Sequence, residues 1–91
     1  MTVDRRLAGL LVQEALGAVV DPAIVATLRE DSPLAAAGLS ATDAVCVADG
    51  VATAAAARAL ACALTDDDLA GATTVADVVD AVVRRTEVPG A

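Results

Sequence analysis

The sequence predicts a small all-α protein, a four-helix bundle with a long first loop. Aliphatic residues recur at the three- and four-residue spacing of a buried helix stripe, and Thr, Ser or Asp precedes each such run as a helix cap. Alanine, the best helix former, makes up about a quarter of the 91 residues, and no aromatic residue is present. Helices that bury so little side-chain area must approach one another to about 8 Å. The small core predicts a marginally stable monomer, so weak homo-oligomerisation is an open alternative.

The first helix is expected over residues 3–16, with Thr2 as its cap and Gly17 as its stop. Its buried stripe is formed by Val3, Leu7, Leu10 and Leu11. Asp21 then precedes a proline, a pair that predicts a short extra helix inside the long connection. The turn signal Asp-Ser-Pro at residues 31–33 closes the segment of this short helix.

A second helical region is expected from Ser40 to Leu64. The Ser40 side chain can cap it, and Asp43 occupies the acidic place of a capping box. Asp49-Gly50 interrupts the region, because Asp-Gly is a favoured turn pair and Gly costs about 1 kcal/mol relative to Ala within a helix. We therefore expect a kink, a loop or a frayed turn at that pair.

Two further caps predict two more helices. Thr65 precedes an acidic first turn at residues 66–68, and Gly71 ends this short third helix. Thr74 and Asp77 form a box-like pair at the start of the last helix. The buried stripe of that helix is Val75, Val78, Val79, Val82 and Val83, and its last turn carries Arg84 and Arg85.

The order helix, long loop, helix, short helix, helix, together with an acidic balance, resembles the acyl carrier protein family. The segment LTDDDLAGATTVADVVDAVV is similar to the third and fourth helices of the family, and PLAAAGL is similar to the loop that leads to its modification motif. The resemblance covers nearly the whole chain. It implies that residues 1–86 form an acyl-carrier-protein-like helical bundle and that residues 87–91 are a flexible C-terminal tail.

The resemblance fails at the residue that carries the cofactor. The family motif is Gly, an apolar residue, Asp, Ser and Leu, whose serine bears 4′-phosphopantetheine. Gly38 and Leu39 match it, Ser40 takes the Asp place, and Ala41 takes the Ser place. Counting back from the third helix without gaps puts Cys46 at the attachment place instead. Neither register supplies serine, so no cofactor is expected; a displaced phosphopantetheine on Ser40 is the alternative.

Charge narrows the choice of partners. Thirteen acidic residues against six basic ones give a net charge of −7, which argues against nucleic acid and favours a basic protein surface. The resemblance implies a carrier-recognising biosynthetic enzyme, such as a ketosynthase or an acyltransferase of polyketide, fatty-acid or peptide natural-product assembly. The candidate partner-binding residues are Leu39, Asp43, Asp49, Asp66, Asp67 and Asp68. The chain is then a pseudo-carrier, an adaptor or regulatory partner without the arm; the alternative is a functional carrier modified at Ser40.

Other functions find little support in the sequence. An enzyme is not expected, because the chain has no His, Lys or Tyr and a general base would have to be a carboxylate. No metal site is expected, and Cys46 and Cys62 are interpreted as small buried apolar residues. No stretch of about 18 apolar residues lacks a charge, and no targeting segment is recognisable, so we expect a cytoplasmic protein that does not bind membranes.

Overall fold

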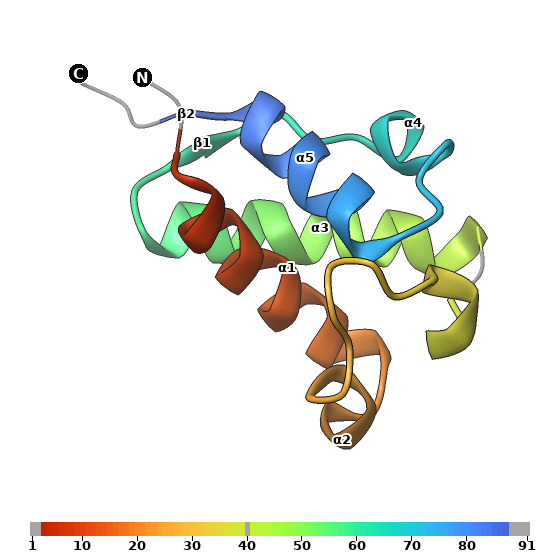
Figure 1. Ribbon diagram of the computed structural model, residues 1–91. Coiled ribbons are helices and arrows are strands. Elements are labelled where there is room, and N and C mark those ends of the chain that lie inside the picture. The colour runs from red at the N-terminus through yellow and green to blue at the C-terminus, as the bar shows by residue number, and fades with distance from the viewer. Residues whose placement is uncertain (1–2, 40, 88–91) are drawn as a thin grey trace.

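The computed structural model describes residues 3–39 and 41–87, most of which are helical (Figure 1). The elements are α1 (Arg5–Val19), α2 (Pro22–Val25), the 3-10 helix η1 (Leu34–Ala37), α3 (Ala41–Ala57), β1 (Ala61–Cys62), α4 (Asp66–Leu69), α5 (Val75–Arg85) and β2 (Thr86–Glu87). In Figure 1, α1 and α5 lie in front of the long helix α3, and α2 lies at the far end of α1. The chain is mostly helical, as predicted, and α2 is the short helix that was expected within the long first connection.

Helix α1 begins and ends later than predicted. The Asp4 side chain accepts a hydrogen bond from the Leu7 backbone N–H at 2.8 Å, so Asp4 is the cap, whereas Thr2 lies outside the described residues. The helix continues through Gly17, and the N–H of Val20 still donates to the carbonyl of Leu16. The helix ends shortly before Pro22, because the proline ring disfavours helical backbone angles at the residue that precedes it. Gly17 as the stop was therefore wrong.

Helix α3 is continuous where an interruption was predicted. Asp49 and Gly50 both lie within it. The reason lies in the neighbouring helix: a Cβ atom added at Gly50 would stand 3.0 Å from the Cβ of Ala15 and 3.1 Å from its Cα. Helices α1 and α3 are thus in close contact at Gly50, and the glycine serves packing rather than a turn.

The structure ends α3 before Leu64, where the sequence led us to expect its end. Leu60 N–H donates to the Ala55 carbonyl and Ala59 N–H to the Ala56 carbonyl, the paired bonds of a Schellman motif. Ala59 adopts the left-handed conformation, with φ of 58°, that this motif requires. The chain then enters β1, which pairs antiparallel with β2 after the end of α5. Neither strand was predicted; Glu87, assigned to the tail, lies in β2, and residues 88–91 lie outside the described residues.

Both capping boxes of the C-terminal half form. The backbone N–H of Thr65 donates to Asp68, that of Thr74 donates to Asp77, and each threonine hydroxyl accepts from the backbone N–H of its aspartate in return. Helix α4 ends at Leu69, two residues before the predicted stop at Gly71. Of the valine stripe in α5, Val78, Val79 and Val82 are buried and the other two are half-buried.

The core lies between α1, α3 and α5 and consists of Leu, Val and Ala side chains. Its largest fully buried apolar members are Leu11, Val12, Leu16, Val51, Val79 and Val82. None of the helices that the structure describes has the length and apolar character needed to span a membrane.

Candidate functional site

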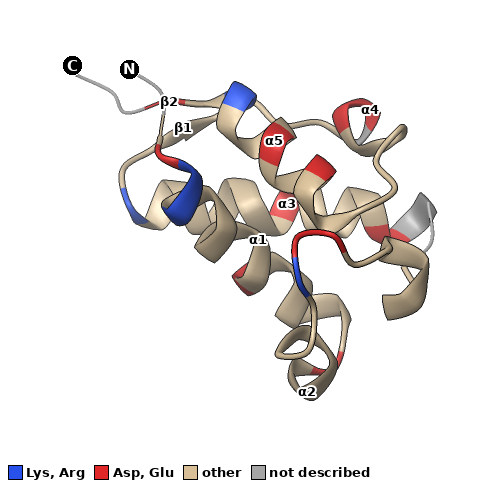
Figure 2. Cartoon of the chain, viewed as in Figure 1, with Lys and Arg blue, Asp and Glu red and all other residues tan. Residues whose placement is uncertain are grey.

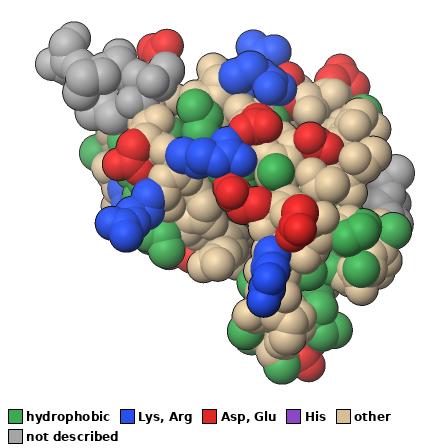
Figure 3. Space-filling view, viewed as in Figure 1, with side chains coloured by type: hydrophobic (Ala, Val, Ile, Leu, Met, Phe, Trp, Pro, Cys, Tyr) green, Lys and Arg blue, Asp and Glu red, His purple; other side chains and the backbone are tan. Residues whose placement is uncertain are grey.

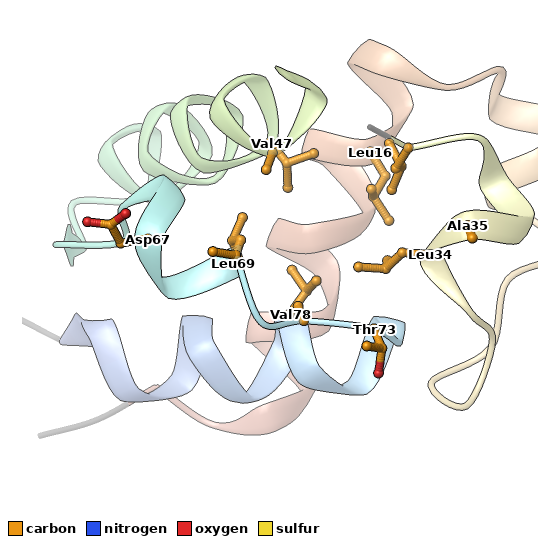
Figure 4. Close-up of a pocket in the computed structure, with 12 residues that line it drawn as sticks. Leu16, Leu34, Ala35, Val47, Asp67, Leu69, Thr73 and Val78 are labelled. Atoms are coloured by element: carbon orange, nitrogen blue, oxygen red, sulfur yellow. The ribbon is translucent and has the colours of Figure 1, made fainter. Parts of the chain in front are cut away.

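A pocket of about 500 Å³ opens beside the start of α3. It lies between α3, η1, α4 and the segment that leads into α5, and Leu16 of α1 contributes to it. Figure 4 shows Leu16, Leu34, Val47, Leu69 and Val78 directed toward one another across this space. Its lining residues are Leu16, Leu34, Ala35, Leu39, Ala44, Val47, Asp67, Leu69, Ala70, Ala72, Thr73 and Val78. The pocket is therefore mainly apolar, and Asp67 is the single carboxylate among the described side chains that line it.

The depth of the pocket is part of the hydrophobic core. Leu16, Val47 and Val78 are almost completely buried, and Leu69 is only 6% exposed. Small side chains such as Ala44, Ala70 and Ala72 form much of the remainder. A core with no aromatic residue leaves this space unfilled, because Ala and Val do not reach across it.

The residues that flank the predicted attachment place in sequence, Leu39 and Ala44, line this pocket. Leu39 lines the pocket, and Ala41 is the first residue of α3. Ser40, between them in sequence, lies outside the described residues. Cys46 lies in the second turn of α3, is exposed and does not line the pocket. The interpretation of Cys46 as a buried residue was wrong, since its side chain lies on the outer face of α3; Cys62 is half-buried.

The predicted partner-binding acids lie on two helices, α3 and α4. Asp49 is exposed on α3, Asp43 is half-buried in the first turn of that helix, and Asp67 lines the pocket. Asp66 is the first residue of α4. In Figure 4 the carboxylate of Asp67 points away from the apolar space, so it belongs to the rim.

Asp68, in contrast, is turned into the molecule. Its side chain is 11% exposed and accepts hydrogen bonds from Arg85 and from Thr65. The backbone N–H of Thr65, followed by the Arg85 guanidinium, lowers the pKa of the Asp68 carboxyl below its ordinary value. An aspartate with these partners is a structural residue, which leaves it little capacity to contact another protein.

Acidic and basic side chains are distributed unequally. Figure 2 shows arginines at the start of α1, after α2 and α3, and at the end of α5, whereas α3 and α4 carry only acidic charges. Figure 3 shows acidic and basic side chains interspersed over the face formed by α1 and α5, and hydrophobic side chains toward α2 and η1. The end of the molecule that holds the pocket is therefore its more acidic part.

Ion pairs fix several of these arginines. Arg5 joins Glu30 of the long connection, at 2.9 Å, to Asp80 of α5. Arg58 pairs with Glu14, and its hydrogen bond lowers the pKa of that carboxyl. Two backbone N–H groups, from Thr73 and Thr74, lower the pKa of Asp77 in the same sense.

Among the described residues, no three His, Cys, Asp or Glu side chains are grouped so that they could hold a metal ion. The pocket itself was missed by sequence reasoning, because its lining comes from five separate segments. The only sign of the pocket in the sequence was that apolar residues, Leu34, Leu39 and Val47, lie on both sides of the start of α3. No protein-family model, curated protein or solved structure matches this chain.

Proposed function

We propose that this chain is an acyl carrier protein-like adaptor that bears no phosphopantetheine arm. The observation that carries the proposal is the position of Ala41, a residue without a hydroxyl, as the first residue of α3 beside an apolar pocket. An attached acyl group would find shelter from water in such a pocket, so a carrier needs its nucleophile at this place. The helix order also supports a carrier-type four-helix bundle, with α1, α3, α4 and α5 as the four helices and α2 in the connection.

A working carrier modified at Ser40 is the second candidate. It is favoured by one observation, that Ser40 directly follows the pocket-lining Leu39 and directly precedes α3. A phosphate on a residue before a helix would meet free backbone N–H groups. The adaptor is preferred because Ser40 stands at the acidic place of the family motif, one residue before the attachment place.

The attachment place can be tested by restoring it. Ser40→Asp with Ala41→Ser restores the Asp and Ser of the family motif, while Thr42 still occupies its Leu place. We expect a phosphopantetheinyl transferase with coenzyme A to load this variant at least in part. Cys46→Ser in the natural background is the matched control for the other register. Loading of Cys46→Ser alone would contradict the assignment of Ala41 to the attachment place.

The partner is proposed to be an enzyme that normally binds a carrier, a ketosynthase or an acyltransferase of polyketide, fatty-acid or peptide natural-product assembly. The acidic end around the pocket, with Asp49 and Asp67 exposed, suits a basic surface on such an enzyme. No catalytic role is assigned to this chain.

Docking can be measured as binding to a purified ketosynthase at low salt. Replacing Asp49 and Asp67 together by Asn should slow association several-fold, because charge complementarity acts mainly on the on-rate. Asp31→Asn, an exposed acid of the connection, is the control and should leave association nearly unchanged. Equal association rates for both variants would argue against docking through the pocket end.

A further inference from the structure

The two short strands place a cysteine beside a threonine. β1 pairs antiparallel with β2, and Cys62 stands directly opposite Thr86 in the register (Figure 1). The N–H of Ala63, which follows β1, donates to the carbonyl of Arg85 at 2.8 Å. Because hydrogen-bonded and non-hydrogen-bonded pairs alternate along an antiparallel ladder, Cys62 and Thr86 form a non-hydrogen-bonded pair. In such a pair the Cα atoms are only about 4.5 Å apart and the side chains lie closest together.

Both side chains of this pair lie on the face of the strands that packs against the core. Cys62 is half-buried against the core and Thr86 is completely buried. Their strand neighbours, Ala61 and Glu87, are exposed. The Thr86 hydroxyl has no hydrogen-bond partner among residues 3–39 and 41–87, the Cys62 sulfur included. A buried hydroxyl without a partner is costly, so this one is a donor that an acceptor beside it would satisfy.

We propose that Cys62 is an oxidation site whose sulfenic acid accepts a hydrogen bond from the Thr86 hydroxyl. The oxidant is hydrogen peroxide. The Cys62 thiol loses its proton, its sulfur attacks one peroxide oxygen, and an S–O bond forms as the O–O bond breaks. The leaving hydroxide takes up a proton and becomes water, so the sulfur loses two electrons and the peroxide gains them. Thiol sulfur is a weak acceptor, and the added oxygen supplies the better acceptor that the Thr86 hydroxyl lacks.

Burial distinguishes Cys62 from the other cysteine of the chain. A sulfenic acid is readily lost when a second thiol attacks it to form a disulfide. Cys46 is exposed on α3, where a thiol of another chain can reach it. Half-burial of Cys62 leaves access for a molecule as small as hydrogen peroxide but hinders the approach of a second protein. Cys62 does not line the pocket beside α3, and its oxidation does not depend on the proposed adaptor role.

The lifetime of the sulfenic acid tests the proposal. Cys46→Ala leaves Cys62 as the single thiol of the chain. This variant is treated with hydrogen peroxide, the excess is removed with catalase, and the product is followed by intact mass and by capture with dimedone. We expect a mass increase of one oxygen atom, and we expect Thr86→Val in the same background to shorten the lifetime of this species about fivefold, the effect of one lost hydrogen bond. Thr86→Ser keeps a hydroxyl and should preserve the lifetime.

Unfolding gives a second readout, which the reactivity of the thiol alone would not change. Oxidation should raise the urea midpoint of the Cys46→Ala variant, because the buried Thr86 hydroxyl gains a partner, and should not raise it when Thr86→Val is also present. Cys62→Ala, which leaves only the exposed Cys46, is the matched control and should give mainly disulfide-linked dimer. Equal lifetimes with and without Thr86→Val, a sulfenic acid that lasts as long on Cys46 as on Cys62, or a urea midpoint that oxidation does not raise would overturn the proposal.

Discussion

The close approach of α1 and α3 makes a specific prediction for Gly50→Ala. In an open helix this substitution stabilises by about 1 kcal/mol, because Ala has the higher helix propensity. Here the added Cβ would stand 3.0 Å from the Cβ of Ala15 and 3.1 Å from its Cα. Ordinary carbon contacts are about 3.5–4.0 Å, so the two helices must separate by about half an ångström.

The cost of that separation exceeds the gain in helix propensity. Overpacking of a well-packed core costs about 1–3 kcal/mol, and the atoms in the way at Ala15 are a methyl group and the backbone itself, which cannot rotate aside. We therefore expect Gly50→Ala to lower the free energy of unfolding by up to about 2 kcal/mol. The helix pair affected is the most extensive one in the fold.

Gly9→Ala is the matched control, because Gly9 also lies inside a helix, but in the part of the chain that the structure describes no other element comes within 4 Å of an added Cβ. It should stabilise the protein by about 0.5–1 kcal/mol. Both variants can be compared by urea denaturation followed by far-ultraviolet circular dichroism, since the chain has no aromatic residue for fluorescence. Stabilisation of Gly50→Ala to the same extent as Gly9→Ala would refute the close approach of α1 and α3.

Three further predictions concern stability. Ala59→Gly should raise the free energy of unfolding by about 0.5–1 kcal/mol, because Ala59 holds a left-handed conformation that glycine adopts without strain; an unchanged urea midpoint would contradict that conformation. Thr86→Val should stabilise by about 1 kcal/mol, since the buried Thr86 hydroxyl has no hydrogen-bond partner among residues 3–39 and 41–87; destabilisation would reveal a partner. The three carboxyls with lowered pKa values stabilise the fold when ionised, so the urea midpoint should be flat from pH 6 to 8 and fall as the pH drops below their ordinary values of 4.5 and 3.8; a midpoint that rises on acidification would contradict this sign.

Several features set by neighbouring residues were predictable from the sequence, although the start and the end of α1 were not. The capping boxes at Thr65 and Thr74, the cap at Asp21 and the valine stripe of α5 each depend on residues within one or two turns. Their local hydrogen bonds and spacing are the same in any helix, which is why pattern alone identifies them.

Features set by distant residues were not predictable. Gly50 suggested a turn locally, but its role depends on Ala15 in another helix. The pocket and the pairing of β1 with β2 likewise join segments that are far apart in the sequence. Asp68 suggested a surface charge, whereas its contact with Arg85 turns it inward. Tertiary contacts decided each of these outcomes.

The central claim, that this carrier-like chain bears no arm, can be tested on the natural protein. Purified chain is incubated with coenzyme A and a phosphopantetheinyl transferase of broad specificity, beside an ordinary acyl carrier protein as positive control, and the intact mass is recorded. We predict an unchanged mass, because Ala41 at the start of α3 offers no hydroxyl to the phosphate. A mass increase by one phosphopantetheine that disappears in Ser40→Ala would contradict the adaptor and establish a carrier modified at Ser40.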